Sequence, residues 1–376
     1  MAVKRFPIAV MLGCFLVFGA DLAEADQAYS FTDLGTLGGS YSQATSINGA
    51  GSIAGAAWVP GNIGSHATVW NTSSASDLTP GLPGVSSQAY AINNFGLVAG
   101  QSVVQLGGSN WAWRATIWNG TSATVLGTLP GTTHTDAWGI NDAGQVAGRS
   151  IVDPFSGHYH ATLWNGSTPT DLGIDSAAYA INQAGLVVGS RNISGDYGAV
   201  GTHATLWNGS VATDLGTLGG SRSEARGINA LGVVVGSSFT NGDASYHATL
   251  WNGAMALDLG TLGGSNSEAY GLNNNGLVVG YSATVGNSSH ATLWNGSIAT
   301  DLNTFLDANT IAAGWLLKSA TAINDNGWIV GTAENTITGQ SHAYLLSTLT
   351  VPEPASYMLM LLGLAVLGVA SRRNVG

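Results

Sequence analysis

The chain has 376 residues and a formal net charge of −11, and only 8% of its residues are charged, against about 25% in an ordinary soluble domain. Its 12 tryptophans and shortage of charge exclude a disordered chain, and its 54 glycines follow no period of three, which excludes a collagen helix. Because an acidic chain repels phosphate backbones, no nucleic-acid partner is expected. The composition favours an all-β protein with many short strands and tight turns.

The first 25 residues have the three parts of a secretory signal peptide. Two basic residues precede an apolar run over residues 6–20, and Ala23 and Ala25 supply the small side chains that precede cleavage. An N-terminal membrane anchor is the alternative. Cleavage after Ala25 would remove Cys14, the single cysteine, so the exported chain would have no disulfide, thiolate nucleophile or cysteine-based metal site.

Residues 26–350 consist of one unit that occurs seven times. Its first motif is Ile-Asn-x-x-Gly, followed by a short apolar pair and a second glycine, and successive asparagines lie 41 to 51 residues apart. These asparagines are Asn48, Asn93, Asn141, Asn182, Asn229, Asn273 and Asn324. A regular spacing of this size indicates a repeat architecture in a single domain.

Two further motifs occur in the unit, His-Ala-Thr-Leu-Trp-Asn-Gly and then Asp-Leu-Gly. Arg114 stands once in place of the histidine, and Val125 stands once in place of the aspartate. The histidines are His66, His160, His203, His247, His290 and His342. They are predicted to be structural, each bonded to nearby backbone or to a hydroxyl group at the start of a strand.

Each unit predicts four strands, a to d. In the fifth unit they cover residues 225–229, 233–235, 247–251 and 258–259. Asn-x-x-Gly forms a tight turn between strands a and b, and the Asn-Gly pair predicts a hairpin between strands c and d. Such repeats are typical of propeller blades, so the sequence predicts an all-β, seven-bladed β-propeller of four-stranded antiparallel blades. A β-helical solenoid is the alternative architecture.

The strand count also predicts how the ring closes. The last strand c, residues 342–346, has no strand d after it, whereas residues 31–34 form one extra strand of the d type before the first unit. The N-terminal strand can therefore complete the seventh blade. Such a closure removes the open edges of the ring.

The units resemble the HAF-type extracellular repeat. Its His-Ala-Phe-like triplet reads here His-Ala-Thr, or His-Ala-Tyr at residues 342–344. The run Asp-Leu-Gly-Thr-Leu-Gly-Gly-Ser at residues 33–40, 214–221 and 258–265 is equally typical of that repeat. The resemblance covers about residues 29–348, and it implies an extracellular protein without implying an activity.

Metal binding is not favoured by these motifs. One histidine per blade places neighbouring histidines too far apart to share an ion whose bonds are about 2 Å long. The Asn-rich turns at residues 273–276 and 324–327 favour hairpins over calcium loops, because the bidentate glutamate of an EF-hand is missing. No metal and no cofactor are therefore expected.

A ligand site is expected where the units differ from one another. The connections between strands b and c vary and carry aromatic side chains suited to stacking on sugar rings, and polar residues occur near the start of strand a. The aromatic residues are Trp58, Trp111, Trp113, Tyr159, Tyr197 and Tyr246, and the polar ones are Asp136, Glu224, Arg226 and Glu268. The alternative is that the aromatic residues only cap the blade edges.

Three functions are compatible with these features. The first is a non-enzymatic module that binds exopolysaccharide or another surface molecule. The second is an extracellular glycan hydrolase or lyase that uses the acids near strand a, which would require two carboxylates about 5–10 Å apart. The third is a structural matrix component without a specific ligand.

The C-terminal residues 351–376 have the layout of a sorting signal. Val351, Pro352, Glu353 and Pro354 precede an apolar run over residues 355–370, which predicts a short membrane helix, and Arg372 and Arg373 follow it. A buried terminal helix is the alternative. The tail resembles the PEP-CTERM signal, which implies exosortase as a partner, transient anchoring in the inner membrane, and delivery to the cell surface or extracellular matrix of a Gram-negative bacterium.

Overall fold

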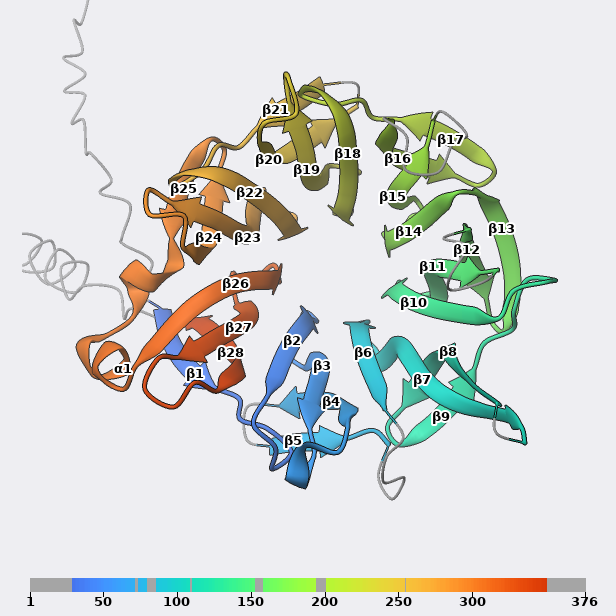
Figure 1. Cartoon of the computed structure of the whole chain (residues 1–376), viewed down its shortest axis with the longest axis horizontal. Helices are drawn as coiled ribbons and strands as arrows, with labels where there is room; N and C mark the ends of the chain where they lie inside the picture. The colour runs from blue at the N-terminus through green and yellow to red at the C-terminus, as the bar shows by residue number, and fades with distance from the viewer. Residues whose placement is uncertain are drawn as a thin grey trace, which may run out of the picture.

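The structure, a computed structural model, describes residues 29–349 apart from 72–73, 80–85, 109, 153–157, 194–200 and 254. Within these residues, seven four-stranded antiparallel sheets stand around a common axis as the blades of a propeller (Figure 1). The all-β, seven-bladed prediction is confirmed. The signal peptide and the C-terminal tail lie outside the described residues.

The strands follow the chain from the axis outward in blades 1 to 6. Blade 1 holds β2 (Ser42–Ile47), β3 (Ile53–Trp58), β4 (Ser65–Asn71) and β5 (Ser74–Asp77), and blade 2 holds β6 (Ser87–Ile92), β7 (Leu97–Gly107), β8 (Asn110–Asn119) and β9 (Ser122–Val125). Blade 3 holds β10 (His134–Ile140), β11 (Gln145–Ile151), β12 (Tyr159–Asn165) and β13 (Thr168–Ile174), and blade 4 holds β14 (Ser176–Ile181), β15 (Val187–Asn192), β16 (Thr202–Asn208) and β17 (Val211–Asp214).

The remaining blades follow the same order until the last one. Blade 5 holds β18 (Gly219–Ile228), β19 (Val234–Thr240), β20 (Tyr246–Asn252) and β21 (Met255–Asp258), and blade 6 holds β22 (Gly263–Leu272), β23 (Leu277–Thr284), β24 (Ser289–Asn295) and β25 (Ile298–Asp301). Blade 7 holds β26 (Trp315–Ile323), β27 (Ile329–Asn335), β28 (Ser341–Thr348) and β1 (Tyr29–Asp33). Short helices are η1 (Pro60–Asn62), η2 (Leu302–Phe305) and α1 (Ala308–Ala312).

The N-terminal strand closes the ring, as the strand count predicts. β1 pairs antiparallel with β28 over all five of its residues, so the outermost strand of blade 7 comes from the other end of the chain (Figure 1). The chain then enters blade 1, whose Ser42 hydroxyl accepts a hydrogen bond from the Ala343 N–H at 2.9 Å. The two ends of the described chain thereby share one sheet, and blades 1 and 7 also make direct contacts.

The core lies between neighbouring blades. The tryptophan of strand c is almost fully buried in blades 1 to 6, and in the cluster between blades 1 and 2, Trp118 packs with Ala54 and Ala67 of the preceding blade. Leu346, also fully buried, occupies the equivalent position in blade 7. A blade alone would expose these faces, so the ring buries apolar surface that no single repeat can bury.

Two strand boundaries differ from the sequence prediction. In most blades strand d ends at the aspartate of Asp-Leu-Gly, as β17 does at Asp214, although the Leu215 N–H still bonds to the Ala204 carbonyl at 2.9 Å; in blade 3, β13 continues to Ile174. The hairpin between strands c and d has Gly209 and Ser210 as its turn residues, since Asn208 pairs with Val211. Gly209 has φ of 58°, which glycine adopts without a Cβ clash.

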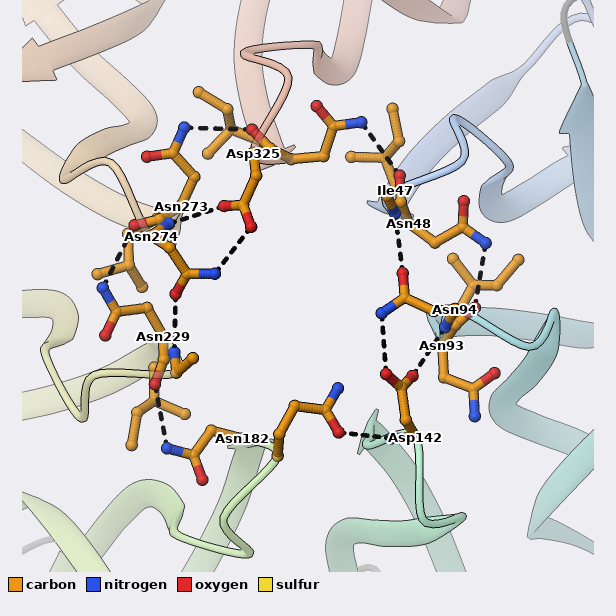
Figure 2. Close-up of a pocket in the computed structure, with 18 of the residues that line it drawn as sticks. Ile47, Asn48, Asn93, Asn94, Asp142, Asn182, Asn229, Asn273, Asn274 and Asp325 are labelled. Carbon is orange, nitrogen blue, oxygen red and sulfur yellow. Dashed lines mark hydrogen bonds between the residues drawn. The ribbon is translucent and has the colours of Figure 1, made fainter.

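The seven asparagines of the first motif form a closed ring of hydrogen bonds around the axis, and Figure 2 shows part of it, including the bond from Asn182 to Asn229. Each side-chain Nδ2 donates to the backbone carbonyl of the asparagine in the next blade, at 3.0–3.3 Å, and Asn324 closes the circle by donating to the Asn48 carbonyl. In most blades the Oδ1 also accepts from two N–H groups of its own turn, as Asn182 does from Ala184 and Leu186. One side chain therefore caps a turn and clamps the next blade.

The repeated histidines have a partner that the sequence analysis did not predict. In six blades the histidine Nδ1 lies 2.6–2.9 Å from a carboxylate oxygen of the aspartate in Asp-Leu-Gly, so the partner is neither a backbone group nor a hydroxyl. In blade 7 this bond joins His342 to Asp33 of β1. In blade 2 both partners are replaced, by Arg114 and Val125, and the Arg114 guanidinium instead donates to the Thr133 carbonyl.

The second glycine of the first motif is required by the close approach of strands a and b. A Cβ on Gly236 would lie 1.9 Å from the Glu224 carbonyl oxygen, and the equivalent glycine of every blade has the same contact at 1.9–2.0 Å. Gly236→Ala is expected to lower the free energy of unfolding by about 2–3 kcal/mol, because backbone must move to admit the methyl group. Chemical denaturation measures the loss, and Gly253→Ala, at an open turn with positive φ, separates this clash from simple φ strain.

Candidate functional site

A β-bulge in every strand a places one residue per blade at the axis. The register between strands a and b shifts after the alanine of Ala-x-x-Ile, so that the next residue has no partner on strand b, as Arg226 lies between the paired residues Ala225 and Gly227. Bulges of this kind re-aim a side chain. The seven bulge residues line one cavity of about 360 Å³, and they are Thr45, Tyr90, Trp138, Tyr179, Arg226, Tyr270 and Thr321.

This axial cavity lies at one end of the central channel. Farther along the axis come the isoleucine or leucine residues of the first motif, and the asparagine ring occupies the opposite end. Because strand a runs toward its Asn-x-x-Gly turn, the cavity is on the face that carries the b–c connections. Blades 1 and 7 contribute only threonines, whose hydroxyls bond to carbonyls of the next blade, so the large side chains come from blades 2 to 6.

Arg226 is held at the wall of this cavity by two carboxylates and one ring. Its Nη2 lies 2.9 Å from Glu224 Oε2 and its Nε 3.1 Å from Glu268 Oε1, and its guanidinium carbon lies 4.6 Å from the centre of the Tyr179 ring. Burial alone would lower the pKa of Arg226, but Glu224 and Glu268 raise it above its ordinary value. The arginine is therefore a fixed, fully charged donor stacked on an aromatic face.

Aromatic residues lie on both sides of Arg226. The rings of Trp138 and Tyr179 have centres 4.9 Å apart, and Tyr270 lies on the other side of Arg226 in blade 6. The Tyr90 hydroxyl donates to Gln88 at 2.5 Å and accepts from Gln101 at 2.8 Å. Burial, reinforced by nearby carboxylates, raises the pKa of Tyr90, Tyr179 and Tyr270, so all three stay neutral at physiological pH.

A second charged pair stands next to the cavity in blade 3. Asp136 is almost completely buried, and its Oδ2 accepts from Arg149 Nε at 2.8 Å. The Arg149 guanidinium carbon lies 4.6 Å from the centre of the Trp138 ring and 5.4 Å from that of Tyr159. This pair and the Arg226 cluster both supply hydrogen-bonding groups whose positions are fixed before any ligand arrives.

The structure brings together some of the predicted ligand residues. The four predicted polar residues lie near the axial cavity. Arg226 lines the cavity, and Glu224 and Glu268 form ion pairs with its guanidinium. Trp113 and Asp136 line a neighbouring pocket between blades 2 and 3.

The predicted aromatic residues are placed less uniformly. Tyr159 lies beneath Arg149, and the Tyr246 hydroxyl bonds to that of Tyr281, which packs near Tyr270. Trp58 contacts Tyr41 outside the axial cavity, and Trp111 is about half exposed on β8. Tyr197 lies outside the described residues.

Sequence reasoning missed four residues of the axial wall, Tyr90, Trp138, Tyr179 and Tyr270. A signal for them was present, because the first variable position of Ala-x-x-Ile holds Thr, Tyr, Trp, Tyr, Arg, Tyr and Thr in successive blades, while its flanks are nearly constant. Variation at one position of an otherwise regular repeat indicates that this position contributes to function instead of to the shared fold.

Two features that other functions would need are not found among the described residues. No cluster of three or more His, Cys, Asp or Glu side chains could hold a metal ion. No helix in this part of the chain is long and apolar enough to cross a membrane, and the membrane helix predicted for residues 355–370 falls outside it.

Comparison with known families matches residues 350–374 to the PEP-CTERM protein-sorting motif. The chain ends in an exosortase sorting signal. The match includes Val351 to Pro354 and both terminal arginines, and it makes this an exported, surface-directed propeller protein. Comparison with curated proteins finds no match.

Solved structures are similar to this chain only weakly. An acylaminoacyl peptidase from Pyrococcus horikoshii is 14% identical with a TM-score of 0.45 over 72% of this chain, and this chain spans 46% of it. The propeller domain of the Trilobed protease from Pyrococcus furiosus is 10% identical (TM-score 0.44; 69% of this chain and 84% of that one). A lectin from Aleuria aurantia is 9% identical (TM-score 0.34; 85% and 100%). Similarities this weak say nothing about activity.

Proposed function

We propose that this exported propeller is a non-enzymatic glycan-binding module, with the axial cavity as its site and exopolysaccharide as its ligand. The observation that carries the proposal is the set of five large side chains, Tyr90, Trp138, Tyr179, Arg226 and Tyr270, that converge on one cavity. A sugar ring has two faces of C–H groups and a rim of hydroxyls. Aromatic faces cover the first, and fixed charged or amide groups bond to the second.

The wall is preorganised for such a ligand. Arg226 is already held by two glutamates and stacked on Tyr179, and the Tyr90 hydroxyl is held by Gln88 and Gln101. Binding would therefore immobilise few side chains, and less of the interaction free energy would be lost to ordering them. The sorting signal supports the same proposal, because a protein directed to the cell surface would meet surface polysaccharide there.

Tyr179→Ala is expected to weaken binding of purified exopolysaccharide from the producing bacterium by roughly tenfold or more, since it removes the ring at the centre of the aromatic wall. Tyr179→Phe keeps the stacking face and should stay within about threefold of the wild type. Affinity electrophoresis and tryptophan fluorescence measure the change, with Tyr41→Ala, a tyrosine outside the cavity, as the control. Equal binding by wild type and Tyr179→Ala would refute the site.

A glycan hydrolase or lyase is the second candidate, favoured by one observation. Burial raises the pKa of Glu268 above its ordinary value even though Arg226 opposes the shift, and a general acid needs such a raised pKa. The Glu224 and Glu268 carboxylates nevertheless both bind the same guanidinium, which leaves neither free to act alone. Depolymerisation that is lost in Glu268→Gln would establish this function, and an unaltered polymer after long incubation would exclude it.

A further inference from the structure

A second pocket opens between blades 2 and 3, beside the axial cavity. Its volume is about 320 Å³, and Tyr90, Gln101 and Trp113 of blade 2 face Asp136, Trp138 and Arg149 of blade 3 across it. Three aromatic rings, one amide and an ion pair between a buried aspartate and a partly exposed arginine thus meet where two repeats come together. The equivalent residues of the other units differ, so this interblade pocket is a property of these two blades and not of the repeat.

The interblade pocket and the axial cavity share a wall. Tyr90 and Trp138 line both, and the Trp138 ring continues into Tyr179 with ring centres 4.9 Å apart. If one sugar ring of a ligand stacked on Trp138 in one pocket, the next sugar ring of the same ligand could therefore reach the other pocket. We infer that the interblade pocket is a second sugar subsite, so that the unit this protein recognises is at least two linked rings; the inference rests on the glycan-binding function proposed above.

The chemistry of the interblade pocket fits an uncharged sugar ring. Arg149 is fixed by Asp136 on one side and by the Trp138 and Tyr159 rings on others, so its remaining N–H groups point in set directions. Asp136 and Gln101 supply acceptors for hydroxyl donors, and Trp113 supplies an apolar face. The guanidinium donors and the carboxylate and amide acceptors match the hydroxyl groups of a pyranose, and the Trp113 ring matches its C–H face.

The charges of both pockets argue against an acidic sugar. Arg149 is paired with Asp136, and Arg226 is shared by Glu224 and Glu268, so no unpaired cation of these clusters is left for a carboxylate or sulfate group. The chain as a whole carries a net charge of −11, which repels an anionic polymer before it reaches either pocket. The expected ligand is therefore a neutral segment of the polysaccharide.

The test measures how affinity depends on ligand length. Fragments of one, two and three rings are prepared from the exopolysaccharide of the producing bacterium by partial acid hydrolysis, sized, and separated by anion exchange into neutral and acidic fractions. Each is titrated by calorimetry into the full-length protein and into Trp113→Ala. Trp111→Ala is the matched control, because Trp111 lies two residues away on β8 and does not line the pocket.

For the wild type, the neutral two-ring fragment should bind roughly tenfold or more tightly than the one-ring fragment, with little further gain for three rings. Trp113→Ala should reduce the two-ring affinity to about that of one ring, while Trp111→Ala should keep the full ratio. Tyr270→Ala, which alters only the axial cavity, should weaken binding of every fragment.

The outcomes separate this inference from the function on which it rests. One outcome is that the fragments bind the wild type while Trp113→Ala and Trp111→Ala show the same ratio of two-ring to one-ring affinity. That result would overturn the second subsite and leave the proposed glycan-binding function intact. Tighter binding of acidic than of neutral fragments would overturn the ligand class. The absence of binding of every fragment and of the intact polymer would overturn both proposals.

Discussion

Removal of β1 is expected to unfold the whole ring, although the strand has only five residues. β1 supplies the outermost strand of blade 7, where Tyr29 is buried and Phe31 contacts both Trp315 and Tyr344. Loss of two such aromatic side chains and of the strand pairing should cost about 5 kcal/mol or more, which is comparable with the entire stability of a typical domain.

The loss of stability should extend beyond blade 7 because β1 covers the outer edge of β28. Without it, the backbone groups of β28 and the cluster that contains Tyr344 and Leu346 face solvent, and an unpaired strand promotes aggregation. A chain that starts at residue 35 should therefore lose its cooperative thermal transition, measured by circular dichroism and calorimetry. A chain that starts at residue 29 is the control and should melt at the same temperature as the chain that starts at residue 26.

Rescue by the missing strand distinguishes loss of closure from general damage. A synthetic peptide of residues 27–35 should restore the transition of the shortened chain when added in excess, because strand addition recreates the β1–β28 ladder and the Asp33–His342 contact. If the chain that starts at residue 35 melts cooperatively at an unchanged temperature without the peptide, β1 does not close the ring.

Asn182→Ala is expected to lower the free energy of unfolding by about 4 kcal/mol, an unusually large effect for one polar side chain. The substitution leaves three buried or half-buried backbone groups without their partners. These are the N–H groups of Ala184 and Leu186, each 3.0 Å from Oδ1, and the Asn229 carbonyl, 3.0 Å from Nδ2. Unsatisfied groups of this kind cost roughly 1–3 kcal/mol each.

Two further variants divide this effect into its parts. Asn182→Asp keeps an oxygen for the two N–H groups of the turn but sets a buried carboxylate oxygen against the Asn229 carbonyl, so at neutral pH the loss should be at least as large as for alanine. At acidic pH the protonated carboxyl can donate to that carbonyl, and part of the loss should be recovered. Asn208→Ala, at the exposed end of β16 in the same blade, is the control and should stay within about 0.5 kcal/mol of the wild type. Urea denaturation of all three measures the clamp, and equal stabilities for Asn182→Ala and Asn208→Ala would show that the ring of asparagines contributes nothing.

Much of the fold follows from the sequence because each repeat contains residues whose local conformation or burial is required by their chemistry. Asn-x-x-Gly and Gly-Ser turns require particular backbone angles, and the apolar residues of strands b and c require burial. The count of strands then leaves β1 as the strand that covers the outer edge of β28. The histidine–aspartate contact was also within reach of the sequence, since blade 2 lacks both members together, at Arg114 and Val125.

The candidate site depended on the tertiary structure for a geometric reason. Residues 41 to 51 positions apart become neighbours only when the blades close around the axis, so no local pattern shows that Trp138 would lie against Tyr179 or that Arg226 would join Glu268. A one-residue bulge in strand a then decides which side chain turns into the channel. The aromatic residues of the b–c connections were the more visible signal in the sequence, but Trp58 and Trp111 lie away from the axial cavity because they belong to β3 and β8, the second and third strands from the axis.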